Sequence, residues 1–202
     1  MTANKAFAEV IESSLQGFIA QSWQWDTFPH FGSMVMIEAK KRNLIGIVHQ
    51  INTGSMDPTR YPFPYQMTEE QLQKEQPQIF AFLKTTFTCV TIGYQEQGNL
   101  FYQLPPEPAK IHAFVQPMPI DLSKQFFYKE RYLHTLFGFA NSIANFDELL
   151  LAILKYQASL NILTEDKVSS FMQTLSLLTG NDYRRLKLFL QRVEPIIEQH
   201  LH

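Results

Sequence analysis

Cysteine is almost absent from this 202-residue chain, with Cys89 as the single example. One cysteine cannot form a disulfide within the chain, which excludes a small secreted fold held together by disulfides. A reducing compartment is the simpler expectation, and we predict a cytoplasmic protein. Cys89 has Phe87 and Val90 as apolar neighbours and no cationic residue beside it to lower its pKa. We therefore interpret it as a buried cysteine rather than as a nucleophile.

Long apolar runs are also lacking. Residues 1–25 contain no basic segment followed by an apolar one, as a signal peptide would, because polar residues interrupt the apolar positions. The longest apolar stretch, around residues 146–154, contains Asp147 and Glu148 and is too short to cross a bilayer. We expect no membrane segment. The net charge of −2 argues against a surface devoted as a whole to binding a polyanion.

Motifs for catalysis and for cofactor binding are missing too. The eight glycines are scattered, without the P-loop pattern or G-x-G-x-x-G, so a Walker-type nucleotide site is not expected. None of the six histidines has the H-x-x-x-H or H-E-x-x-H spacing of a metal site. The acidic pairs 69–70 and 147–148 stand at predicted helix starts, where the helix dipole accounts for them. We predict no catalytic residue, no metal and no cofactor.

Two halves of different character make up what the sequence does contain. Ten of the eleven prolines precede residue 120, and leucine dominates after it. The double-proline segment 116–119 fits a connector, because neither a helix nor a central strand accepts it. We predict an α+β protein, with a small closed antiparallel β-barrel over residues 1–118 and an all-helical C-terminal subdomain of about four helices over residues 119–202.

The barrel half contains two predicted hairpins. The stronger one spans residues 34–51 and begins with an apolar run that indicates a strand buried on both faces or in the wall of a barrel. Within it, Gly46 marks a bulge or a barrel corner. The second hairpin spans residues 85–104. Between the two, Thr68 and Gln71 form a capping-box pattern that predicts the start of a short helix.

The second half shows helical periodicity and helix-capping residues. Asp121 or Ser123 is expected to cap a helix that runs to about Phe139. Asn145 and Thr164 are expected to cap the next two helices, whose leucine-rich stripes recur at helical spacing. These patterns predict helices that cover one another with apolar faces.

A basic cluster lies on the last predicted helix and consists of Arg184, Arg185, Lys187 and Arg192. Arg185 and Arg192 are seven residues apart and therefore share a helix face. The cluster is a candidate contact for nucleic acid or for an acidic partner. The competing interpretation is a solvated polar face opposite the apolar residues of the helix, which we favour because no stripe of alternating basic and aromatic residues surrounds the cluster.

Short segments spread along the chain are similar to one known family. They are FAEVIESS (7–14), FGSMV (31–35), LIGIV (44–48), TIGY (91–94), LPPEP (104–108), IHAFV (111–115), DELL (147–150) and GNDYRRL (180–186). They resemble the HAS-barrel of HerA-type DNA translocase ATPases and the segment that follows this barrel in some members. These 202 residues contain no RecA-like motor, so ATPase and translocation activities are not implied. The resemblance implies the role of the barrel in that family, which is ring assembly and docking of a partner nuclease.

Two functions of different classes follow as hypotheses. The leading one is a non-catalytic assembly or adaptor protein that uses a HerA-like barrel for self-association or for docking a protein partner in DNA processing, with any contact to nucleic acid indirect. The alternative is a ligand-binding barrel, or an enzyme with a site assembled from scattered residues such as His49, His112 and Tyr94. A deep polar pocket in the barrel would favour the alternative, and a barrel filled by side chains would exclude it.

Overall fold

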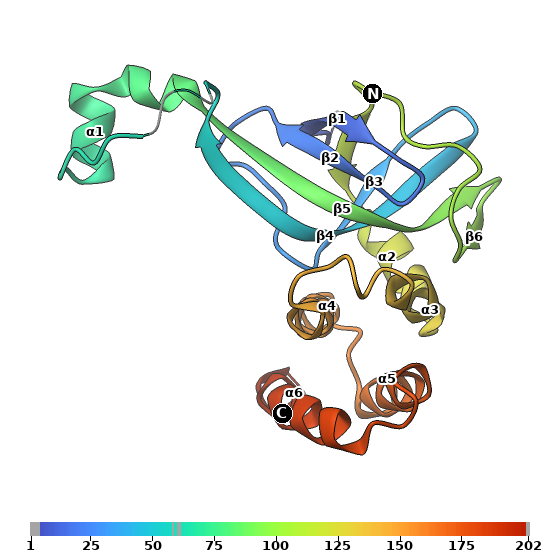
Figure 1. Cartoon of the computed structure of the whole chain (residues 1–202). Coiled ribbons are helices and arrows are strands. Elements are labelled where there is room, and N and C mark those ends of the chain that lie inside the picture. The colour runs from blue at the N-terminus through green and yellow to red at the C-terminus, as the bar shows by residue number, and fades with distance from the viewer. Residues whose placement is uncertain (1–4, 58, 60–61, 201–202) are drawn as a thin grey trace.

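The computed structural model describes residues 5–57, 59 and 62–200 (Figure 1). Its strands are β1 (Ala8–Ser13), β2 (Gly17–Ser22), β3 (Met34–Ile37), β4 (Arg42–Ser55), β5 (Leu83–Glu96), β6 (Asn99–Phe101) and β7 (Phe114–Pro117). Its helices are α1 (Glu69–Glu75), the 3-10 helix η1 (Pro77–Phe82), α2 (Ile120–Phe126), α3 (Arg131–Phe137), α4 (Phe146–Ser159), α5 (Glu165–Leu178) and α6 (Tyr183–His200). The change from strands to helices falls between β7 and α2, but the predicted connector 116–119 is only partly right, because Gln116 and Pro117 end β7 and pair with Met36 and Val35 of β3.

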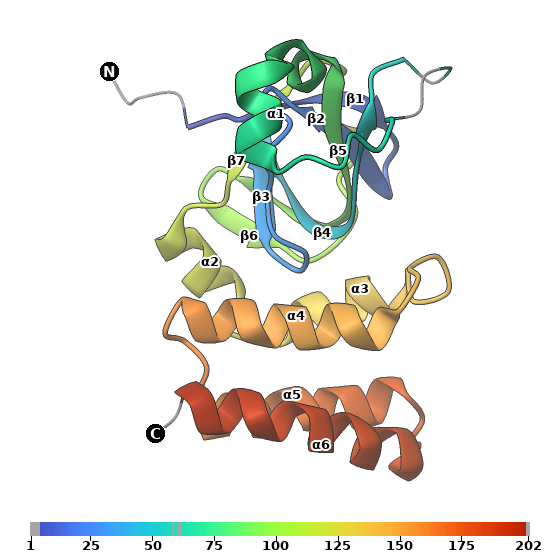
Figure 2. The ribbon, with the colours of Figure 1, turned by 90° about the vertical axis from the view of Figure 1, so that its left-hand side faces the viewer.

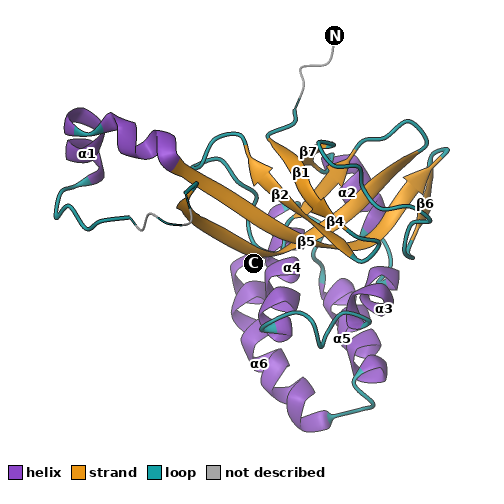
Figure 3. Cartoon of the chain, turned by 45° about the horizontal axis from the view of Figure 1, so that its top comes forward, coloured by secondary structure: helices purple, strands orange, loops and turns teal. Residues whose placement is uncertain are grey.

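Six strands close into a barrel. Neighbours around it follow the order β1, β2, β5, β4, β3, β7 and back to β1, and every pair is antiparallel. β6 pairs with the end of β5 as a hairpin. Closure lets the barrel strands satisfy their backbone hydrogen bonds without leaving an open edge. The predicted fold class, a closed antiparallel barrel followed by helices, is confirmed (Figure 3).

Side chains fill the barrel. Successive residues of a strand point to opposite faces, so β3 sends Val35 and Ile37 inward and Met34 and Met36 outward, and all four are buried. The inward side chains form one apolar cluster, made of Ala8, Val10, Phe18, Ala20, Val35, Ile37, Leu44, Val48, Phe87, Cys89, Tyr94, Ala109 and Val115. The apolar run at the start of the first hairpin is therefore buried on both faces, as its pattern predicts.

Two strand glycines of the barrel wall stand where a side chain would collide with a neighbour. An added Cβ at Gly17 in β2 would lie 2.3 Å from the carbonyl oxygen of Cys89 on β5, so the pairing of these strands leaves no room for a side chain. Gly46 lies at a register shift next to Ile45 in β4, and a Cβ there would lie 2.9 Å from the ring of Phe18. The irregularity predicted at Gly46 is present in this pairing, but the extra residue is Ile92 on β5, opposite the step from Ile45 to Gly46.

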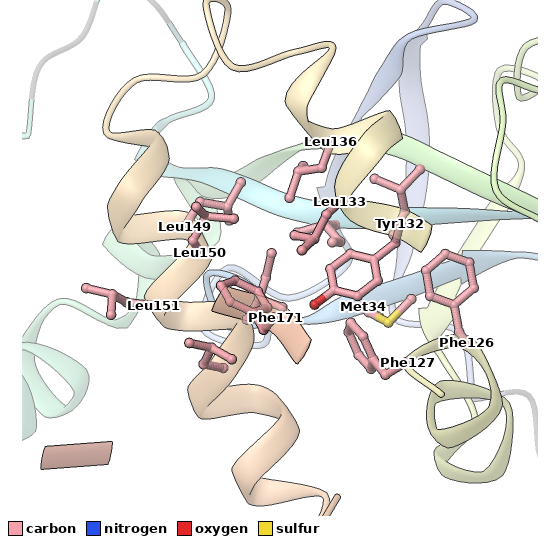
Figure 4. Packing of buried hydrophobic residues seen from close by; sticks show 14 of the residues in the cluster. Met34, Phe126, Phe127, Tyr132, Leu133, Leu136, Leu149, Leu150, Leu151 and Phe171 are labelled. Atoms are coloured by element: carbon pink, nitrogen blue, oxygen red, sulfur yellow. The ribbon is translucent and has the colours of Figure 1, made fainter. Parts of the chain in front are cut away.

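The helices of residues 120–200 stack against the barrel in two layers (Figures 1 and 2). α3 and α4 lie against the barrel, and α5 and α6 lie beyond them. Outward-facing strand residues such as Met34 and Ile47 share one core with Tyr132, Leu149 and Phe171 of the helices (Figure 4). In residues 5–57, 59 and 62–200, none of the helices combines the length and the apolar character that a membrane span requires.

The first helix predicted for the second half is divided in two, so the described residues 120–200 contain five helices where the sequence predicts about four. α2 ends at Phe126, and α3 begins only at Arg131. On one straight helix, Phe127 and Tyr132 would point about 140° apart. The bend between α2 and α3 brings their rings within 5.0 Å, in the same core.

The predicted helix caps have mixed outcomes. The capping box of Thr68 and Gln71 is present, with both of its hydrogen bonds formed. Thr164 caps α5 by accepting a hydrogen bond from the backbone N–H of Lys167 at 3.2 Å. Asn145 is the N-cap residue of α4, as predicted, but its φ is 57° and its side chain forms no capping hydrogen bond. Its amide can tolerate the left-handed conformation, which turns the chain into α4.

Candidate interaction surfaces

An arm projects from one side of the barrel (Figures 1 and 3). β4 and β5 continue as a two-stranded ribbon beyond the last contact with β2, up to the pairing of Ser55 with Leu83. η1 and α1 follow at the end of this ribbon. We define the arm as residues 53–57, 59 and 62–85. Two strands and a short helix outside a core gain little from burial, so the arm must be positioned by local contacts.

The base of the arm is fixed to the loop that follows β2. The ring of Trp25 stacks on Phe80 of η1 with 5.6 Å between centroids, and the Thr85 hydroxyl donates a hydrogen bond to the Trp25 carbonyl. Within the ribbon, the hydroxyl groups of Thr53 and Thr85 are 2.7 Å apart, and the N–H of Met56 donates to the carbonyl of Phe82 at 2.8 Å. These contacts hold the arm away from the barrel in a defined direction.

The two helices of the arm, α1 and η1, have no hydrophobic core of their own. Neither α1 nor η1 contains a buried residue, and a capping box fixes the start of α1. A helix of seven residues is marginal in water without a packing surface. The tip is therefore an ordered element without a core of its own, which is typical of segments that dock on another molecule.

Large apolar side chains on the arm face solvent. Phe63 is 72% exposed and contacts Tyr65 edge-to-face with 5.8 Å between centroids. Met56, Met67 and Phe82 are exposed as well. The neighbouring helix α1 contributes three carboxylates, from Glu69, Glu70 and Glu75, and one cation, Lys74. The arm thus combines exposed aromatic rings with negative charge. Sequence reasoning missed this surface, and the alternation of Phe63, Tyr65 and Met67 with other residues in an extended segment was the available signal.

The predicted basic cluster does not act as one cationic face. Arg185 donates two hydrogen bonds to Asp147 on α4, and Arg192 forms an ion pair with Glu148 on the same helix. The contact with Asp147 raises the pKa of Arg185. Both carboxylates stand in the first turn of α4, where the helix dipole favours negative charge. Arg185 and Arg192, two of the four cations in the predicted cluster, therefore join α6 to α4.

The other two cations of the cluster, Arg184 and Lys187, line two different depressions. Arg184 lines a shallow depression of about 370 Å³ together with Arg185, Arg192 and two aspartates. Lys187 lines a separate apolar groove between α5 and α6. Among the described residues, no carboxylate lies within ion-pair distance of Arg184 or Lys187. Of the four cations in the cluster, Arg184 and Lys187 are therefore the two that the described carboxylates leave available to an outside partner.

The residues of the alternative hypothesis are not brought together. Tyr94 belongs to the packed barrel interior and stacks on Phe101 with 4.9 Å between centroids. The side chain of His112 is largely exposed, and its Nδ1 lies 3.2 Å from Oε2 of Glu9. His49 lines a depression of about 250 Å³ with Glu12, and burial lowers its pKa. Within the described residues, the three do not form a common site.

Cys89 lies in the filled interior of the barrel, where burial raises its pKa well above the ordinary value. The thiol therefore stays protonated and is shielded, as expected for a structural cysteine. Within residues 5–57, 59 and 62–200, no group of three His, Cys, Asp or Glu side chains is arranged to hold a metal ion.

Comparison with known proteins gives no family for this chain. No protein-family model matches it, and no curated protein matches it.

Proposed function

We propose that this chain is an assembly or adaptor protein that docks a protein partner through its arm. The observation that carries the proposal is the arm tip, which is ordered outside the barrel while α1 and η1 bury none of their residues. The barrel interior is filled by apolar side chains, which supports a scaffold role over ligand binding inside the barrel. The anchored base, at Trp25 and Phe80, presents the tip in a fixed orientation and so lowers the entropic cost of docking.

The exposed residues of the arm indicate what kind of partner it binds. Exposed Phe63, Tyr65 and Phe82 fit an apolar pocket, since aromatic anchors dominate many protein interfaces. The carboxylates of α1 call for a basic rim around that pocket. The same negative charge opposes direct contact between the arm and nucleic acid. A protein with an apolar pocket and basic residues around it is the partner that fits.

The HAS-barrel resemblance supports a more specific form of this proposal. A six-stranded closed barrel followed by helices is compatible with the barrel of HerA-type ATPases. In that family the barrel serves ring assembly and docking of a nuclease, so we place the adaptor in DNA processing. The resemblance lies in short segments, and the identity of the partner tests this finer proposal.

Affinity capture with matched variants tests the arm. The wild type, Phe63→Ser/Phe82→Ser and Tyr128→Ser are immobilised and exposed to extract from the source cells, and the retained proteins are quantified by mass spectrometry. Tyr128 is 73% exposed on the helical side of the molecule and matches Phe63 in exposure. We expect a partner that the wild type and Tyr128→Ser retain, and that the arm variant loses at least roughly tenfold.

The partner is then purified and its affinity measured directly. Reversal of charge in Glu69→Lys/Glu70→Lys should weaken its binding if basic residues surround the pocket. Retention of every captured protein equally by the arm variant would overturn the proposal. If the captured partner processes DNA, the finer proposal is supported, and a partner with no link to DNA would contradict it.

A further inference from the structure

The outer wall of the barrel, formed by the outward faces of β1 and β7, carries a pair of aromatic rings. Trp23, which follows β2, and Phe114 on β7 meet edge-to-face with 5.4 Å between centroids. Both side chains are about half exposed and lie outside the two buried apolar cores. β7 lies beside β1 on the part of the barrel that faces away from α5 and α6 (Figure 3). The pair is therefore an ordered apolar feature of a surface that faces solvent.

A pocket of about 280 Å³ opens beside Phe114. Its lining consists of Ala6, Glu38, His112, Phe114 and Gln116. The wall of the pocket thus combines an aromatic ring with side chains that form hydrogen bonds. None of the described residues that line it is a lysine or an arginine.

The carboxylate of Glu38 is held in place but has no cation beside it. Its Oε1 accepts a hydrogen bond from Nε2 of Gln116 at 2.5 Å, which joins the end of β3 to β7. Among the described residues, no lysine, arginine or histidine forms an ion pair with Glu38. Two acceptors at the pocket, Oε2 of Glu38 and the side-chain carbonyl of Gln116, therefore have no donor within the described chain.

A second carboxylate of this surface, that of Glu9, already has its partners. Its Oε1 accepts a hydrogen bond from Nε1 of Trp23 at 3.2 Å, and its Oε2 lies 3.2 Å from Nδ1 of His112. The first of these contacts positions the indole that supports the ring of Phe114. Glu38 is thus the carboxylate of the pocket that is open to a cation from outside.

We propose that this pocket binds the guanidinium group of an arginine that a protein partner presents. A guanidinium is planar and positively charged, and it stacks on an aromatic face such as the ring of Phe114. Its fork of N–H donors suits two neighbouring acceptors, which Glu38 and Gln116 supply. The ammonium group of a lysine is a compact point charge and does not stack in this way. The open carboxylate repels phosphate, so a nucleic acid does not fit here.

The arginine site goes beyond the docking proposed for the arm and does not rest on it. None of the residues that line the pocket belongs to the arm. The arm variant Phe63→Ser/Phe82→Ser should therefore leave arginine binding unchanged. Failure of either proposal can be recognised without the other.

NMR titration of the ¹⁵N-labelled full chain with N-acetyl-arginine amide tests the chemistry of the pocket. We expect saturable shifts of the side-chain amide of Gln116 and of the indole N–H of Trp23, with a dissociation constant in the millimolar range. The indole of Trp25, which stacks on Phe80 at the base of the arm, is the internal reference. N-acetyl-citrulline amide has nearly the same shape without the charge and should bind at least roughly fivefold more weakly. Absence of saturable shifts, or equal binding of the two amides, would overturn the proposal.

Two variants test the carboxylate and the ring separately. Glu38→Gln removes the charge and Phe114→Leu removes the aromatic face, and each should weaken binding of the arginine amide at least roughly threefold. Glu12→Gln is the matched control, because Glu12 is an exposed carboxylate on β1 that lines a different depression. The amide spectrum of each variant verifies its fold. Equal losses in Glu38→Gln and Glu12→Gln would attribute the effect to net charge and contradict the site.

A short peptide tests whether the arginine comes from a protein. The peptide acetyl-Gly-Val-Arg-Val-Gly amide adds apolar side chains that can contact the exposed ring of Trp23 while the arginine occupies the pocket. It should bind at least roughly fivefold more tightly than the arginine amide. Binding of the peptide no tighter than that of the amide would show a pocket for small guanidinium compounds and would overturn the protein partner.

Discussion

Arg185 binds Asp147 with two nitrogen atoms, from Nη2 to Oδ1 at 2.5 Å and from Nε to Oδ2 at 3.3 Å. With the neighbouring pair of Arg192 and Glu148, this contact joins the last helix to the start of α4. The two helices also meet in the core through residues such as Phe189. The ion pairs thus reinforce a packed interface from its solvent side.

Arg185→Ala should lower the free energy of unfolding by about 1 kcal/mol, because the pair is bidentate but partly exposed. The side chains of Arg185 and Asp147 are 40% and 38% exposed. Urea denaturation measures the effect. Arg184→Ala is the control, since among the described residues Arg184 has no ion pair, and it should change stability by less than ~0.5 kcal/mol. Equal losses in both variants would show that the pair with Asp147 contributes nothing.

The same contacts predict how the chain responds to duplex DNA. Asp147 and Glu148 neutralise two of the four cations in the basic cluster, so binding should be weak. Asp147→Asn/Glu148→Gln would free Arg185 and Arg192, strengthen binding and make its salt dependence steeper by up to about two phosphate contacts. Fluorescence anisotropy across a salt series measures both quantities.

The control for this experiment removes the same number of charges elsewhere. Asp121→Asn/Asp166→Asn takes two exposed carboxylates from the first turns of α2 and α5. If it strengthens DNA binding as much as the α4 variant does, the change follows from net charge alone. The intramolecular pairing of the arginines would then have no bearing on binding.

Closure of the barrel depends on Gly17. A methyl group there would lie 2.3 Å from a backbone oxygen of β5, so Gly17→Ala must separate β2 from β5. We expect a loss of about 3 kcal/mol in the free energy of unfolding. Gly54→Ala is the control, because no atom lies within 4 Å of the added carbon at this other strand glycine. Urea denaturation that ranks the two variants equally would contradict the role of Gly17 in closure.

The barrel could be predicted because its strands carry their own signals. The apolar run 34–37, the strand glycine Gly46 and the turn residues between hairpins are local in sequence. The arrangement of the arm could not be predicted from the sequence. The capping box at Thr68 predicts the start of α1, but nothing in it reveals that α1 contacts no core, because burial depends on how far β4 and β5 extend beyond the barrel.

The ion pairs of the basic cluster could not be predicted from the sequence either. Arg185 and Asp147 each belong to a charged group that is visible in the sequence, yet 38 residues separate them. Their pairing depends on the packing of α6 on α4, which no local pattern contains. Sequence reasoning that treats each group alone therefore counts cations that the fold has already neutralised.

His49 predicts how stability responds to acid. It lies at a register shift of β4, between Val48 and Gln50, and burial lowers its pKa from the ordinary value near 6.5. The unfolded chain therefore binds a proton at a higher pH than the folded chain does. As the pH falls through 6.5, the proton favours the unfolded state, and the free energy of unfolding decreases until the pH is below the folded pKa.

The test is a series of urea denaturations between pH 7.5 and about 5. The wild type should lose stability over this range, and His49→Gln should respond less because the residue no longer titrates. His134→Gln replaces an exposed histidine on α3 and should keep the wild-type response. A response in His49→Gln as steep as in the wild type would place the acid sensitivity at another group and show that burial of His49 does not couple its protonation to folding.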